Sequence, residues 1–136
     1  AALGLLQLKY VDHALSQREK IDAAYRERLK CVKGIRCLND SGGKVANFSY
    51  FQIMVGDDYP ISRDSLYQKL KDNGIHSRRY FYPLISDFSV YRGFPSAHGK
   101  NLPVAVTAAQ QVLCLPIYPG LDMSVIDKIA QFISAR

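Results

Sequence analysis

The sequence predicts a small α/β sandwich, in which helices cover a sheet of about three strands. Apolar residues recur every three or four positions over residues 1–33 and again from 122 onward, which is typical of helices. Short β-branched and aromatic runs bounded by turn residues lie between them, at 48–55, 75–82 and 112–117, and the run at 75–82 is expected to be a strand or an extended segment. With 136 residues, the chain is long enough for one domain with a hydrophobic core.

One long helix is expected over residues 1–33, with Gly34 as its stop. Because a helix of that length is unusual in a small domain, we interpret it as a connecting helix that leads into a domain over 34–136. The sequence has no initiating Met, and its apolar helical pattern starts at Ala1 without a capping residue. We therefore expect either a fragment or a chain from which an upstream segment was removed.

The Asn, Asp, Ser and Gly residues within 36–47 predict a loop. Within it, Gly42-Gly43-Lys44 resembles part of a phosphate-binding loop, but the Ser or Thr and the helix that complete that motif are missing. A turn is the preferred interpretation. After the strand at 48–55, Ser62 is in position to cap a helix over 63–73.

The C-terminal half alternates between irregular and regular segments. The Tyr-, Phe- and Gly-rich residues 85–100 show no helical period and predict a long loop, a kind of segment that is often functional. The remaining apolar spacing predicts a helix from Pro103 through Ala109, a strand over 112–117, and a final helix starting at Asp122 or Ser124.

The composition narrows the classes of function. A net charge of +6 is compatible with anionic partners, but the basic residues are dispersed, so neither a nucleic-acid arm nor a membrane partner is expected. Three cysteines, Cys31, Cys37 and Cys114, match neither a CxxC pair nor a zinc cluster. We interpret them as reduced thiols of a cytoplasmic protein.

Residues 74–84 are the most informative segment, because Arg78 and Arg79 run directly into three aromatic residues, Tyr80-Phe81-Tyr82. Guanidinium forks suit phosphate or carboxylate, and unpaired charges are costly to bury. The segment is therefore expected at an edge or a site. Two interpretations stay open: an anion-binding site, or surface ion pairs that cover an edge strand.

No self-contained active site is visible. His13 is expected to be a surface or packing residue, and His98 a solvated loop residue. His76 lies four positions before Tyr80, but no serine or cysteine has the sequence context of a nucleophile, and no pair of carboxylates is placed for acid–base chemistry. The adjacent acids Asp57-Asp58 lack a third metal ligand and are expected to form a solvated turn. We predict neither catalytic nor metal-binding residues in this chain.

Six stretches, in this order, together resemble the C-terminal small domain of the DegT/DnrJ/EryC1/StrS family of pyridoxal phosphate (PLP)-dependent aminotransferases. The resemblance implies the small-domain fold of fold-type I aminotransferases. The matching stretches are Ala1–Leu8, Tyr50–Val55, Arg63–Leu66, Gly74–Leu84, Leu102–Ala105 and Val112–Leu121.

The resemblance implies that the full enzyme moves an amino group, usually from glutamate, to a nucleotide-linked keto-deoxysugar of the dTDP type for surface-polysaccharide or sugar biosynthesis. It places the PLP-binding groups and the Schiff-base lysine in an upstream large domain, so this chain alone should be inactive and should bind no cofactor. Homodimers are the implied assembly. A substrate-contact role is carried onto Tyr80, with Arg78, Arg79 and Tyr82 as further candidates.

One departure leaves the exact sugar open: Ile85 stands where many family members have a histidine. Two other classes also stay open. The chain could be a stand-alone anion- or nucleotide-binding module without catalysis, or a basic nucleic-acid binder, which steep salt dependence of binding to random DNA would reveal.

Overall fold

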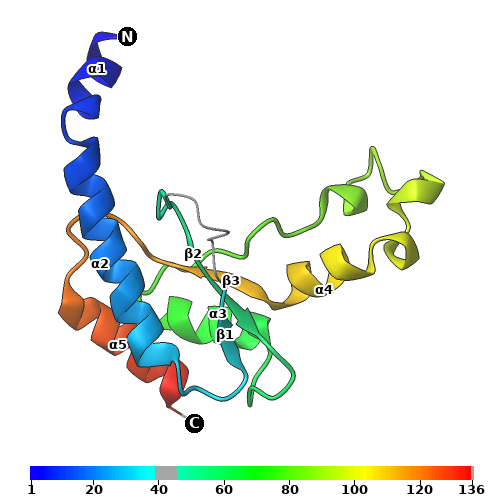
Figure 1. Ribbon diagram of the computed structural model, residues 1–136. Helices are drawn as coiled ribbons and strands as arrows, with labels where there is room; N and C mark the ends of the chain where they lie inside the picture. Colours follow the sequence, from blue (N-terminus) through cyan, green and yellow to red (C-terminus); the bar gives the residue numbers. More distant parts are fainter. Residues whose placement is uncertain (39–45, 136) are drawn as a thin grey trace.

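The computed structural model describes residues 1–38 and 46–135, and Figure 1 shows its arrangement. The Gly42-Gly43-Lys44 stretch lies outside the described residues. The regular elements are α1 (Ala2–Leu8), α2 (Val11–Leu29), β1 (Ile35–Cys37), β2 (Phe51–Val55), α3 (Arg63–Asp72), α4 (Pro103–Gln111), β3 (Val112–Leu115) and α5 (Met123–Ser134). Three short 3-10 turns interrupt the long loop before α4, at Ile85–Asp87, Pro95–Ala97 and Gly99–Asn101.

The sheet is antiparallel, with the strand order β1-β2-β3, so the predicted α/β class with three strands is confirmed. In the central strand, Ile53 pairs with Cys37 on one side and with Leu113 on the other. The identity of the strands differs from the prediction in two places. The first strand falls partly in the segment expected to be a loop, and residues 75–82 contribute only one bridge, from Arg78 to Cys114.

Of the two forms expected for residues 75–82, a strand or an extended segment, the strand is wrong, because the segment makes a single bridge and leaves the extended conformation at Phe81. Phe81 has a φ of +45°, in the left-handed region, which interrupts the extended backbone. The side chains of the second half of the segment contact α3 and each other instead of alternating across a sheet, as described below.

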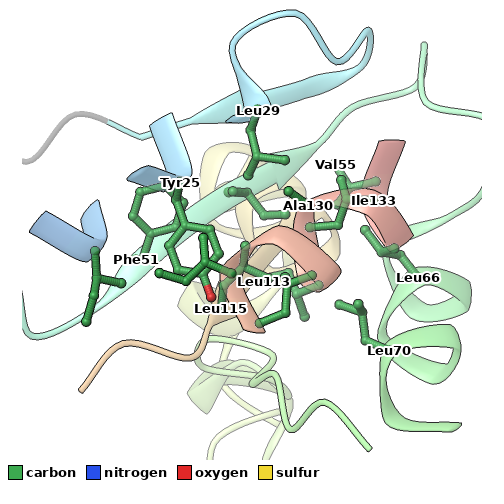
Figure 2. Close-up of a cluster of buried hydrophobic side chains, with 14 of the residues drawn as sticks. Tyr25, Leu29, Phe51, Val55, Leu66, Leu70, Leu113, Leu115, Ala130 and Ile133 are labelled. Atoms are coloured by element: carbon green, nitrogen blue, oxygen red, sulfur yellow. The ribbon is translucent and has the colours of Figure 1, made fainter. Parts of the chain in front are cut away.

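The core lies between the sheet and the helices α2, α3 and α5 (Figure 2). Alternate residues of β2 point into it, as the period of two along a strand requires: Phe51, Ile53 and Val55 are buried. Tyr25 of α2 stacks on Phe51 with a centroid distance of 4.8 Å. The helices α2 and α5 therefore share one apolar layer with the central strand.

The expected helix over 1–33 is two helices, and this is a correction. Tight turns with i to i−3 bonds from Lys9 and Tyr10 interrupt it, and α2 ends at Leu29, its last buried residue. No residue of α1 is buried, and α1 projects beyond the rest of the molecule (Figure 1). Tertiary packing therefore supports only the second half of the predicted helix. Among the described helices, none is both long and apolar enough to cross a bilayer.

The caps of the other helices follow the sequence signals. The backbone N–H of Ser65 donates to Ser62 Oγ at 3.1 Å, at the start of α3, which confirms the predicted cap. The final helix uses Asp122, whose carboxylate accepts from the Ser124 N–H at 2.7 Å. That bond lowers the pKa of Asp122. The short helix from Pro103 is also confirmed, and it ends at Gln111 rather than Ala109.

The buried hydroxyl of Tyr25 supplies a first prediction. It donates to the Pro116 carbonyl at 3.0 Å, and burial raises its pKa. Tyr25→Phe leaves that carbonyl without this donor, and we expect a loss of about 1 kcal/mol in unfolding free energy, measured by urea denaturation. The control is Tyr10→Phe, because Tyr10 is 65% exposed. Equal midpoints for the two variants would show that the Tyr25 bond contributes nothing.

Candidate functional site

The segment Arg78–Tyr82 begins along the free edge of β3. The N–H of Arg78 donates to the Cys114 carbonyl at 2.9 Å, and the Cys114 N–H donates back to the Arg78 carbonyl at 2.8 Å. Because β3 is an outer strand of the sheet, this pair covers part of its edge. The sequence-based expectation of an edge position is therefore confirmed.

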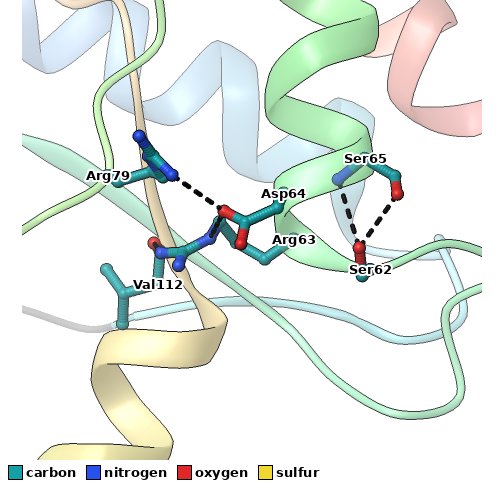
Figure 3. Close-up of polar contacts among 6 residues, drawn as sticks. All are labelled: Ser62, Arg63, Asp64, Ser65, Arg79 and Val112. Atoms are coloured by element: carbon teal, nitrogen blue, oxygen red, sulfur yellow. Dashed lines mark hydrogen bonds and ion pairs between the residues drawn. The ribbon is translucent and has the colours of Figure 1, made fainter. Parts of the chain in front are cut away.

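The side chain of Arg79 turns toward α3. Its Nη1 lies 3.4 Å from Oδ1 of Asp64 (Figure 3), and its Cζ lies 4.8 Å from the ring centroid of Tyr67. The ring of Tyr82 lies on it as well, at 4.7 Å. Arg79 thus forms an ion pair with a carboxylate, as in the second of the two interpretations of this segment. Its side chain is still 35% exposed.

Arg78 differs from its neighbour. It is exposed, and among residues 1–38 and 46–135 no ion pair to it is found. A guanidinium in this state keeps its donors for solvent or for an anionic ligand. Of the two arginines predicted for the site, Arg78 is the better placed to bind phosphate.

Aromatic rings complete the surroundings. Tyr80 meets the ring of Tyr50 edge to face at 5.2 Å and lies 4.1 Å from the ring of Phe81. A pocket of about 200 Å³ is lined by these rings together with Arg78, Arg79 and Tyr82. The structure therefore brings the four predicted site residues to one pocket.

Sequence reasoning missed Tyr50 as a lining residue. Tyr50 directly precedes β2, within an aromatic run that was interpreted only as a strand. Its 41% exposure beside the buried Phe51 follows from the alternation of side chains along the chain. The same alternation, extended by one residue before the strand, would have predicted that the Tyr50 ring is exposed.

A second cavity, of about 380 Å³, shares Tyr50 and Arg78 with the first and adds His76 and Cys114. Burial raises the pKa of the Cys114 thiol to about 11, although the nearby Arg78 lowers it. At neutral pH this thiol stays protonated, so it is not an activated nucleophile. His76, which is exposed, has no hydrogen-bonded partner among the described residues that would make a catalytic pair.

A larger cavity, of about 600 Å³, lies beside the end of α5 and includes Arg28 and Lys69. Arg28 and Lys69 are already engaged there, whereas the third cation of the lining, Lys33, is exposed and forms no ion pair among the described residues. Arg28 pairs with Asp127, and Lys69 donates to the carbonyls of Phe132 and Ala135. We place the candidate site at the Arg78–Tyr82 pocket, because the exposed guanidinium of Arg78 lies there beside a second guanidinium and several aromatic rings.

The described residues form no group of three or more His, Cys, Asp or Glu that could hold a metal ion. PLP chemistry needs a lysine amine, and no lysine is found among the described residues that line the Arg78–Tyr82 pocket. The pocket's residues do not fit that cofactor. Guanidinium, phenol and ring faces suit the binding of an anionic ligand with a flat or sugar-like body.

Comparison with known proteins gives the context of this pocket. The DegT/DnrJ/EryC1/StrS aminotransferase family matches residues 1–134. The chain is 45% identical over all of its 136 residues to the dTDP-4-amino-4,6-dideoxy-D-glucose transaminase of Escherichia coli, and 42% identical over 98% of its length to that of Shigella dysenteriae.

The fold agrees with these relatives. A crystal structure of DesI with its TDP-sugar product matches 98% of this chain with a TM-score of 0.89 at 28% identity, and the match covers 33% of that protein. The chain likewise spans only 37% of the Escherichia coli relative and 36% of the Shigella dysenteriae relative. A family match over nearly the whole chain and a common fold lead to one conclusion: this chain belongs to the DegT/DnrJ/EryC1/StrS aminotransferase family.

Proposed function

We propose that this chain is the C-terminal small domain, 34–136, with its connecting helices, 1–33, of a longer PLP-dependent aminotransferase. The enzyme transfers an amino group from glutamate to a dTDP-linked keto-deoxysugar. The observation that carries the proposal is the pocket lined by Arg78–Tyr82 on a chain of this family. Two relatives, both dTDP-4-amino-4,6-dideoxy-D-glucose transaminases, support this substrate class.

The chain's own residues bind and orient the nucleotide sugar in this proposal. The exposed fork of Arg78 suits the diphosphate, and Arg79 adds positive charge from the 35% of its side chain that stays exposed. Tyr80 and Tyr82 offer ring faces and hydroxyls to the sugar nucleotide. PLP, when bound, supplies the electron sink, and we assign its lysine and its phosphate-binding groups to the part of the longer protein beyond this chain.

The assembly, location and partners of the longer enzyme are part of the same proposal. We propose a homodimer in the cytoplasm that supplies aminosugars for polysaccharide biosynthesis and has neither a nucleic-acid nor a membrane partner. The apolar residues of α1 support an assembly role, since Leu3, Leu5 and Leu8 are each more than 60% exposed. Exposed apolar surface of this extent marks contact with another protein surface.

A chimera tests the proposal. In it, this chain replaces the matching 37% of the Escherichia coli relative. We expect the chimera to transaminate that enzyme's sugar nucleotide, and Arg78→Ala in the chimera to raise KM for the sugar nucleotide about tenfold, since one charge-assisted bond is lost. Its matched control is Arg92→Ala, because Arg92 is an exposed arginine outside the pocket lining.

A folded chimera that binds PLP but transfers no amino group would contradict the proposal. The isolated 136-residue chain distinguishes the alternative of a stand-alone binding module. With PLP and glutamate it should give no spectrum beyond that of the free cofactor. Tight dTDP binding by the isolated chain, without any activity in the chimera, would favour the binding module.

A further inference from the structure

We propose that Arg63 and Asp64, the first two residues of α3, are positioning residues that hold Arg79 and Tyr82 in place for the ligand. This inference rests on the proposed function, because it assigns the ligand pocket to Arg78–Tyr82. Neither residue lines that pocket. Each acts through a neighbour that does.

Arg63 anchors the arrangement. Its side chain is only 2% exposed, and its Nη1 donates to the Val112 carbonyl at 2.9 Å, where α4 passes into β3. Its Nε donates to Oδ1 of Asp64 at 2.8 Å. A buried guanidinium needs such partners, since an unpaired one is costly. The start of α3 is thereby tied to the sheet.

Asp64 connects this anchor to the site. The same Oδ1 that accepts from Arg63 lies 3.4 Å from Nη1 of Arg79 (Figure 3). One carboxylate oxygen therefore contacts two guanidinium groups that are 16 positions apart in the sequence, 63 and 79. The N-terminal turn of α3 also favours an acidic residue at this position.

Both guanidinium groups also contact the ring of Tyr82. The Cζ of Arg63 lies 5.1 Å from its centroid and that of Arg79 lies 4.7 Å away. These distances are in the range of cation–π attraction. Arg63, Asp64, Arg79 and Tyr82 thus form one cluster, which we call the arginine cluster, and two of its members are pocket residues.

Charge and burial distinguish the two residues of the arginine cluster that cannot bind the ligand, Arg63 and Asp64, from the two that can. Arg63 is too buried to touch a ligand, and Asp64 would repel a diphosphate that approached it directly. Their contribution to the ligand is therefore to fix the rotamers of Arg79 and Tyr82 before binding. A side chain that is already ordered loses less entropy when the ligand binds.

Asp64→Asn in the chimera tests this inference, since it removes the charge and keeps the shape. We expect KM for the sugar nucleotide to rise about two- to fivefold, the range for one partly exposed ion pair. The rate of the half-reaction with glutamate should stay unchanged, because no sugar is present in it. Asp64→Glu, which keeps the charge, should recover most of the affinity. Asp72→Asn, at the other end of α3, is the matched control.

The outcomes separate this inference from the proposed function. If the unmutated chimera has no transaminase activity, the proposed function fails. If it is active and Asp64→Asn keeps the parental KM, or raises it no more than Asp72→Asn does, the positioning role is wrong. Equal losses in the sugar step and the glutamate half-reaction, accompanied by a lower Tm, would show a purely structural role and would also overturn the inference.

Discussion

Gly34→Ala is expected to lower the free energy of unfolding of this chain by about 2–5 kcal/mol, from backbone strain and overpacking together. Gly34 has a φ of +80°, which side chains rarely adopt, and a Cβ built there would lie 2.3 Å from the backbone nitrogen of Tyr59. Backbone atoms cannot move aside as the end of a flexible side chain can. The substitution must therefore push apart the link between α2 and β1 and the turn after β2.

The same chain contains a matched control for this prediction. Gly74 has a nearly identical φ of +75°, but a Cβ there would meet nothing within 4 Å. We expect Gly74→Ala to cost about 1–2 kcal/mol, from conformation alone. Urea denaturation followed by circular dichroism gives both values. Equal losses for the two variants would show that the close approach to Tyr59 has no energetic effect.

Arg63→Ala is the second change with a large expected effect, about 2–4 kcal/mol of unfolding free energy. The Val112 carbonyl loses its 2.9 Å donor, and the space of a side chain that is 2% exposed is left open. Asp64 is 56% exposed, so water can take over its lost bond at little cost. The loss therefore comes from Val112 and from the packing of the arginine stem.

Two variants make the Arg63 measurement specific. Arg63→Lys keeps the charge and most of the stem but cannot donate to Val112 and Asp64 in the same fork geometry, so it should recover only part of the loss. Arg92→Ala removes an exposed arginine and should change the urea midpoint very little. A stability for Arg63→Ala equal to that of Arg92→Ala would contradict a structural role for the buried guanidinium.

Elements with strong local signals were predictable. The caps Ser62 and Asp122 mark the starts of α3 and α5 because a side-chain oxygen satisfies an N–H that the first helical turn leaves free. The strand β2 is readable because its buried side chains alternate. Such signals lie within a few residues of the element they define.

Elements that depend on distant partners were not predictable. The strand β1 has only three residues, too few for a period, and exists because it pairs with β2. The break near Tyr10 has no glycine or proline to announce it. It reflects the lack of buried residues in α1, and burial is a property of the folded molecule.

The chain by itself determined the class of this protein, because its order of motifs matches one family over residues 1–134. It also predicted the candidate site, because Arg78–Tyr82 are consecutive and share one stretch of backbone. Only the tertiary structure decided which arginine is paired. The packing of α3 beside this segment brings Asp64 to Arg79 and leaves Arg78 exposed. An ion pair between distant parts of a chain depends on how its helices and strands pack. A local sequence pattern does not predict this packing.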